Sequence, residues 1–125
     1  MAAPLVIRGR IVVVDDHAGF RGTVRRLLEA DGWEVVGEAA DGRTAIGCVE
    51  ALRPDVVLLD IGLPDLDGFA VADRIGPCGP AVVLVSSRDA AAYGGRIARS
   101  PARGFLAKAD LDIGALRAVL IGRPT

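Results

Sequence analysis

Residues 53–68 read RPDVVLLDIGLPDLDG, and this stretch decides the fold. Its first half holds residues 55–59, whose valines and leucines follow one another without a break. A continuous apolar run, rather than one at every second position, is typical of a strand that is buried on both faces of a parallel sheet. The second half, residues 61–68, is rich in glycine, proline and aspartate, which predicts a loop. We therefore expect a buried strand with Asp60 at its end.

The same alternation extends along the chain. Four further runs of apolar and β-branched residues predict strands at 10–14, 34–38, 81–85 and 102–108. Segments with apolar residues at helical spacing predict helices at 18–31, 41–52, 69–75, 89–99 and 111–121. Strict alternation of strands and helices predicts an α/β fold, a doubly wound, five-stranded parallel sheet of flavodoxin-like type. The length fits one domain, residues 1–125, with its core at about 10–121.

Polar side chains follow four of the predicted strands. Asp15 and Asp16 follow the first, Asp60 the third, and Lys108 the fifth. Ser86 and Ser87 follow the fourth strand. Ligands of doubly wound sheets bind outside the carboxyl ends of the strands, so we expect these side chains to share one crevice.

Three carboxylates in one crevice repel each other unless a positive charge lies among them. An oxygen-only set of ligands favours a hard cation, and Mg²⁺ is the abundant one. A lysine adds a second positive charge, and a hydroxyl can hydrogen-bond a phosphoryl oxygen. A carboxylate can itself be the nucleophile, so the set suits phosphoryl transfer to an aspartate.

Composition and charge exclude several classes. The net charge is −1 with scattered basic residues, so we expect no direct contact of this chain with nucleic acid. The longest apolar run falls far short of the roughly 20 residues of a membrane span. The two cysteines, Cys48 and Cys78, lack metal-ligand spacing and read as reduced thiols. These observations predict a soluble, cytoplasmic domain without a membrane partner.

At this point the motifs resemble those of a family. DDH after the first strand, LLDIGLPDLDG after the third, SS after the fourth and GFLAK at the fifth resemble the receiver domains of bacterial two-component response regulators, which are CheY-like. The stretches GEAADGRTA and RPDVVLLD are most similar to receivers of the NarL/FixJ type. The resemblance spans about residues 10–120 and includes the expected (βα)5 fold.

The resemblance implies a role for each matching residue. Asp60 occupies the position of the phosphoacceptor, with Lys108 as the matching lysine. Asp15 and Asp16 match the acidic pair that holds Mg²⁺ together with Asp60. The backbone carbonyl of Gly62 matches the position that completes the metal coordination. These two aspartates, Asp60 and Gly62 are therefore the expected metal ligands.

The switch residues and the partners follow from the same resemblance. Ser86 matches the hydroxyl residue that bonds the phosphoryl group, and Phe105 matches the aromatic switch residue. The implied partners are a sensor histidine kinase as donor, a downstream effector protein or a C-terminal output domain, and a second copy of the chain as a homodimer. Such a domain phosphorylates and dephosphorylates itself but is not a metabolic enzyme.

Two readings from other classes compete with a signalling switch. The first is a Mg²⁺-dependent phosphohydrolase with an aspartyl nucleophile, but such enzymes need a carboxylate two residues after the nucleophile, where Gly62 stands. The second is an interaction module that works without phosphorylation.

Several residues receive a plainer interpretation. We expect His17 in the first turn of a helix and partly exposed, and Trp33 and Tyr93 as packing or partner-surface residues. Asp65 and Asp67 belong to the loop and its turn into the next helix. Lys108 is followed by Ala109 where the family commonly has proline, which predicts a trans bond.

Overall fold

A computed structural model describes residues 9–121, apart from the side chain of Cys78. It contains one parallel sheet of five strands in the order β2-β1-β3-β4-β5. The strands are β1 (Arg10–Val14), β2 (Glu34–Ala39), β3 (Val56–Asp60), β4 (Ala81–Ser86) and β5 (Gly104–Ala107). The predicted doubly wound α/β sheet is confirmed, with strand bounds displaced by one or two residues from the expected ones.

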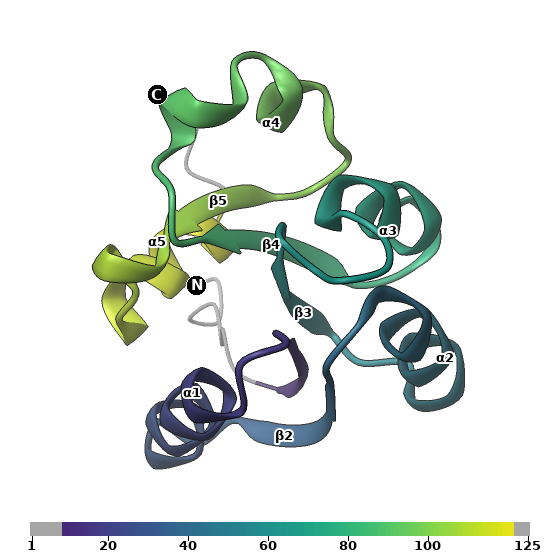
Figure 1. Cartoon of the computed structure of the whole chain (residues 1–125). Helices are drawn as coiled ribbons and strands as arrows, with labels where there is room; N and C mark the ends of the chain where they lie inside the picture. The colour runs from purple at the N-terminus through teal and green to yellow at the C-terminus, as the bar shows by residue number, and fades with distance from the viewer. Residues whose placement is uncertain (1–8, 122–125) are drawn as a thin grey trace, which may run out of the picture.

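Helices cover both faces of this sheet (Figure 1). The longer helices are α1 (Ala18–Ala30), α2 (Gly42–Leu52), α3 (Gly68–Ile75) and α5 (Ile113–Ile121). The side chains of β1 alternate between two apolar clusters: Val12 and Val14 pack with α2 and α3, whereas Ile11 and Val13 pack with α1 and α5. This arrangement explains why the strand runs are apolar at every position rather than at every second one.

Local capping explains where two of the helices begin. The Asp41 side chain accepts a hydrogen bond from the Thr44 N–H at 2.7 Å and caps α2. The Asp67 side chain caps α3 by accepting from the Ala70 N–H at 2.8 Å. Trp33 is 4% exposed and belongs to the cluster beneath α1 and α5, so its interpretation as a packing residue is confirmed.

The expected helix over residues 89–99 is wrong. The segment forms a short 3₁₀ turn, η2 (Ala90–Tyr93), followed by a single helical turn, α4 (Arg96–Arg99). Gly94 lies between them with φ 57° and ψ −130°, a conformation outside the helical region that favours glycine. Gly94 therefore separates two short turns, and no single helix spans residues 89–99.

The end of the chain differs in smaller ways. A 3₁₀ turn, η3 (Lys108–Asp110), follows β5, so α5 begins at Ile113 rather than at residue 111. Another 3₁₀ turn, η1 (Gly76–Cys78), follows α3. No cis peptide bond occurs in the described range, so the expected trans bond between Lys108 and Ala109 is confirmed. Residues 1–8 and 122–125 of the expected domain lie outside the described residues.

Candidate functional site: an acidic cluster at the strand ends

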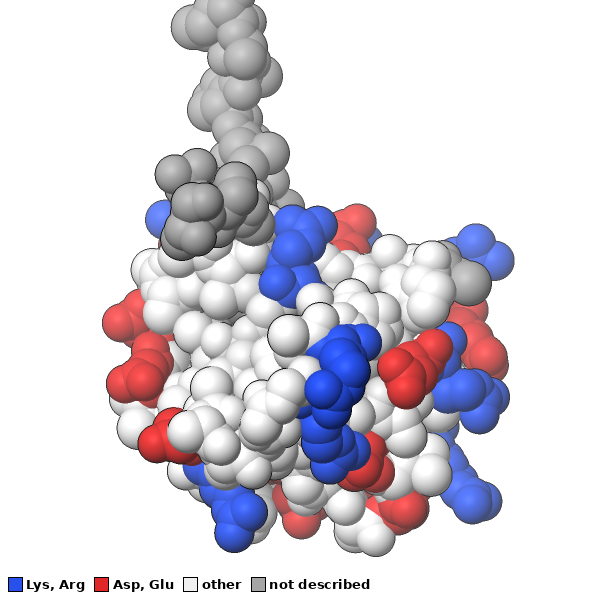
Figure 2. Space-filling model, turned by 90° about the horizontal axis from the view of Figure 1, so that it is seen from above, with Lys and Arg blue, Asp and Glu red and all other residues white. Residues whose placement is uncertain are grey.

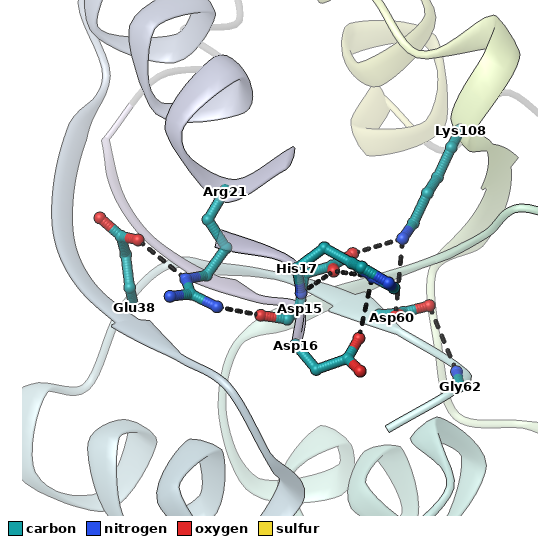
Figure 3. A network of polar contacts seen from close by, with 8 residues as sticks. All are labelled: Asp15, Asp16, His17, Arg21, Glu38, Asp60, Gly62 and Lys108. Carbon is teal, nitrogen blue, oxygen red and sulfur yellow. Dashed lines mark hydrogen bonds and ion pairs between the residues drawn. The ribbon is translucent and has the colours of Figure 1, made fainter. Parts of the chain in front are cut away.

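Five of the predicted site residues meet at the carboxyl edge of the sheet: Asp15, Asp16, Asp60, Gly62 and Lys108 (Figure 3). Asp15 follows β1 directly and is fully buried, while Asp60 is the last residue of β3 and 5% exposed. Asp16 is exposed beside them. Since β1 and β3 are neighbours in the sheet, their ends bring these carboxylates together.

Lys108 bridges two of the carboxylates from the end of β5. Its Nζ lies 2.5 Å from Asp15 Oδ2 and 3.6 Å from Asp60 Oδ2. The ammonium also lies 4.4 Å from the centre of the Phe20 ring, which is a cation–π contact. The single positive charge of Lys108 thus faces two buried carboxylates. Lys108, Asp15 and Asp60 together keep a net negative charge when both carboxyl groups are ionised.

The pKa of Asp60 reflects its burial and the negative charges beside it. Burial raises the pKa of Asp60 above its usual range, and the charges of Asp15 and Asp16 raise it further. The Gly62 N–H, which donates to Asp60 Oδ1 at 3.2 Å, and the Lys108 ammonium act in the opposite direction. Burial and the like charges outweigh these two effects, so the pKa of Asp60 is raised overall. A cation bound here would offset the repulsion between the carboxylates.

The donor atoms fit a hard cation. Oxygens of Asp15, Asp16 and Asp60 and a ring nitrogen of His17 all lie within 4.8 Å of one another. Asp15 Oδ2 is buried, and its partner within the described residues is the Lys108 ammonium at 2.5 Å. Three carboxylates suit Mg²⁺, whereas the imidazole does not belong to its preferred ligands.

His17 caps the start of α1 and lies beside the site. Its carbonyl accepts the first helical hydrogen bond, from the Arg21 N–H, as expected for the first turn, and its side chain is 73% exposed. Its Nδ1 lies 3.3 Å from Asp15 Oδ1 and 3.1 Å from Asp16 Oδ1. The backbone N–H of His17 also donates to Asp15 Oδ1 at 2.8 Å.

A polar network that the sequence did not reveal fixes the end of β1. The Arg21 guanidinium donates to the backbone carbonyl of Asp15 at 2.5 Å and to Glu38 Oε1 at 3.0 Å. Arg25 donates to the other Glu38 oxygen at 2.6 Å and also pairs with Glu29. Hydrogen bonding to Arg25, more than to Arg21, holds the pKa of Glu38 below its usual range. Asp15 is thereby held from the side of α1 and β2.

The loop after β3 is tied to α2 by Asp65. Its carboxylate accepts hydrogen bonds from the backbone N–H groups of Gly42 at 2.7 Å and Arg43 at 3.1 Å. These bonds, that of Gly42 first, keep the pKa of Asp65 below its usual range. A Cβ at Gly62 would meet nothing within 4 Å, so that position borders open space. That the Gly62 carbonyl ligates the metal remains a prediction.

The switch residues lie on the other side of the cluster. Ser86 is 4% exposed, and its hydroxyl lies 2.5 Å from the Tyr93 hydroxyl. The Tyr93 ring packs against Phe105, with 6.1 Å between the ring centres. Tyr93 is therefore a packing residue, as expected, but its contact with the predicted switch serine was missed. The only sequence signal was a single tyrosine seven residues after Ser86.

The charged surface is mixed. Figure 2 shows the face with η2 and α4, where basic and acidic side chains lie side by side between uncharged areas. Arg96 on α4, for example, pairs with Asp67 at 3.0 Å. Within residues 9–121, no helix is long and apolar enough to cross a membrane.

Comparisons with known proteins place these features in a wider group. Residues 11–120 match the family model described as the response regulator receiver domain. The chain is 39% identical over 123 residues to the transcriptional regulatory protein NarL of Mycobacterium tuberculosis, covering 96% of this chain and 57% of that protein. It is 36% identical over 118 residues to the transcription regulator BvgA of Bordetella pertussis, covering 90% of this chain and 56% of that protein.

Solved structures agree with the sequence comparisons. The signal receiver domain of the response regulator NarL from Mycobacterium tuberculosis superposes with a TM-score of 0.78 at 39% identity, over 91% of this chain and 94% of that one. A LuxR-family two-component response regulator from Aurantimonas sp. SI85-9A1 gives a TM-score of 0.80 at 30% identity, over 91% and 86%. The chain spans about half the length of the curated relatives that it matches.

Proposed function

This chain belongs to the response regulator receiver domains of two-component systems, as its motifs predicted, and we propose that Asp60 is its phosphoacceptor. The observation that carries the proposal is the position of Lys108, whose ammonium faces both Asp15 and Asp60 across the strand ends. Asp15 lies 2.5 Å from this ammonium and Asp60 3.6 Å, so Asp60 is the less tightly paired carboxylate and the better placed nucleophile.

The proposed reaction takes a phosphoryl group from a phosphohistidine of a sensor histidine kinase. A carboxylate oxygen of Asp60 attacks the phosphorus, the phosphorus–nitrogen bond breaks, and the imidazole leaves with its electron pair and takes up a proton. Lys108 is positioned to pair with the charge that the phosphoryl oxygens bring. Hydrolysis by water returns the free carboxylate and inorganic phosphate.

Asp15, Asp16 and Asp60 are the residues that would hold Mg²⁺, with the Gly62 carbonyl as a further ligand. When bound, Mg²⁺ would neutralise negative charge on the transferring group. The close approach of the three carboxylates and the raised pKa of Asp60 support this assignment, because a bound cation would offset the repulsion between the carboxylates.

We propose a switch rather than an enzyme that acts on a metabolite. Gly62 occupies the position where an aspartyl phosphohydrolase needs its acid–base carboxylate, and its N–H only donates to Asp60. Ser86 and Phe105 would carry the change in charge to the surface of η2, α4 and β5. The proposed partners are a sensor histidine kinase, a downstream effector or output domain, and a second copy of the chain.

The test is intact-mass spectrometry after incubation with Mg²⁺ and acetyl phosphate. We expect the mass of one phosphoryl group to be gained, and the gain to be lost in Asp60→Ala. Asp73→Ala removes an exposed carboxylate on α3 and serves as the matched control, which keeps the gain. A folded protein that gains no mass would instead favour an interaction module that works without phosphorylation.

A further inference from the structure

Tyr93 joins three parts of the domain around the predicted switch serine. It is the last residue of η2 and the only tyrosine in the chain. Its ring contacts Phe69 of α3 edge-on, with 5.7 Å between the ring centres, and also packs against Phe105 of β5. Its hydroxyl reaches Ser86 at the end of β4. One side chain thus connects the switch hydroxyl with the aromatic switch position.

The Ser86 hydroxyl has few bonds to give. A serine hydroxyl offers one proton and two lone pairs. The Arg88 N–H donates to Ser86 Oγ at 3.0 Å and occupies one lone pair. Tyr93 takes either the second lone pair or the proton at 2.5 Å. Within the described residues, no hydrogen bond joins Ser86 to Asp60 or to Lys108.

The Ser86 hydroxyl has two competing partners, the Tyr93 hydroxyl and a phosphoryl group on Asp60. A serine side chain occupies discrete staggered rotamers. A change of rotamer that turns the Ser86 hydroxyl from Tyr93 toward a phosphoryl group on Asp60 would break its bond to Tyr93. The Tyr93 hydroxyl then loses its protein partner, while its ring contacts with Phe69 and Phe105 are free to rearrange.

We propose that Tyr93 is a positioning residue that holds the Ser86 hydroxyl away from the acceptor carboxylate, and that phosphorylation of Asp60 breaks the Tyr93–Ser86 hydrogen bond. The inference rests on the proposed function of Asp60 and Ser86. Its consequence lies in η2, none of whose residues is buried. Tyr93 is the one residue of η2 that is not exposed, and its contacts join this segment to Ser86 of β4 and Phe105 of β5.

The first test is a double-mutant cycle with beryllofluoride and Mg²⁺, a non-covalent mimic of the phosphoryl group. Tyr93→Phe keeps the ring and deletes only the hydroxyl. We expect it to tighten beryllofluoride binding about fivefold, the scale of one neutral hydrogen bond. In a Ser86→Ala background the same substitution has no effect, because the hydroxyl it releases is absent. Unchanged or weaker binding in Tyr93→Phe, or an equal effect in both backgrounds, would overturn the proposal.

The second test reads the hydrogen bond directly. Since the chain has one tyrosine, protein labelled with ¹³C at the tyrosine Cζ gives a single carbon signal from Tyr93. We expect this signal to shift on addition of beryllofluoride and Mg²⁺, toward the position that it has in free Ser86→Ala. A signal that stays in place while the ligand binds would contradict the proposal.

Different results would refute the proposed function and the role of Tyr93. If the wild-type chain gains no phosphoryl mass and binds no beryllofluoride, the proposed function falls and the role of Tyr93 falls with it. If the wild-type chain does both and Tyr93→Phe behaves like it, only the role of Tyr93 is refuted.

Discussion

The two sides of the site are built in different ways. On one side, the carboxylates of Asp15 and Asp60 are buried at the ends of β1 and β3, and Arg21, Glu38 and Arg25 fix the backbone of Asp15 from α1 and β2. On the other side, Ser86, Tyr93 and Phe105 meet beside two short helical turns, η2 and α4, neither of which buries a residue.

This difference separates two physical requirements. A cluster of like charges must be held in place, because small displacements change its electrostatic energy strongly. A surface that responds to a change in charge must be close in free energy to a second arrangement, and such segments come from the least stable parts of a fold. The buried strand ends with Asp15 and Asp60 suit the first requirement. The exposed turns η2 and α4 suit the second.

Hydrogen exchange should show this contrast most strongly. We expect backbone amides of η2 and α4 to exchange about a thousandfold faster than those in the middle of α1, which corresponds to about 4 kcal/mol of opening free energy. The reason is that α1 buries Val24 and Leu28 over 13 residues, whereas α4 is a single turn. Mass spectrometry of exchanging peptides measures the ratio, and equal protection of both segments would remove the basis of the comparison.

Glycine substitutions should separate the two sides by sign. Gly94→Ala places a Cβ on a backbone with φ 57°, and we expect it to lower the free energy of unfolding by about 2 kcal/mol. The matched control is Gly47→Ala in α2, where a Cβ also meets nothing within 4 Å. There we expect a gain of about 0.5–1 kcal/mol, because alanine favours the helix. Urea unfolding measures both, and two effects of the same sign would contradict the backbone argument.

Sequence reasoning succeeded where single elements carry the signal. The central strands β1, β3 and β4 were found because their apolar runs are buried on both faces, and the aspartates, Ser86 and Lys108 because they stand at strand ends. The helix at 89–99 failed because periodicity does not report that Gly94 adopts a positive φ.

The missed contacts depend on more than one element. Arg21 and Glu38 lie 17 residues apart and meet only because α1 packs against β2. Tyr93 meets Ser86 only because the chain turns back in η2. Neither distance follows from a pattern within one helix or strand, so these contacts required the structure.

Arginine substitutions test whether the network on the first side positions the metal ligands. Arg21→Gln removes one bond to Glu38 and the bond to the Asp15 carbonyl, whereas Arg25→Gln removes a bond to Glu38 and leaves Asp15 untouched. We expect Arg21→Gln to weaken Mg²⁺ binding about tenfold, the usual effect of losing a residue that orients a metal ligand. Arg25→Gln should leave it nearly unchanged. Calorimetric titration with Mg²⁺ measures both, and equal losses would mean that Glu38 matters rather than the clamp on Asp15.

The smallest expected effect is on the free energy of unfolding, which the repulsion within the acidic cluster lowers. In metal-free buffer at neutral pH, we expect Asp60→Asn to raise the free energy of unfolding by about 1 kcal/mol, because it removes a buried charge beside two others. The pKa of Asp60 is raised in the folded chain, which therefore binds more protons than the unfolded chain between the ordinary and the raised value. Wild-type stability thus falls as pH rises through that window, and the variant lacks this decline.

Urea unfolding followed by the fluorescence of the buried Trp33 measures this difference across the pH range. Asp73→Asn, an exposed position on α3, is the control and should change little. Mg²⁺ should narrow the gap, because it stabilises the wild-type cluster and binds less well without the Asp60 carboxylate. If Asp60→Asn instead destabilises the metal-free protein, the ion pair with Lys108 outweighs burial and repulsion. The negative charge of Asp60 would then stabilise the fold even without a bound cation.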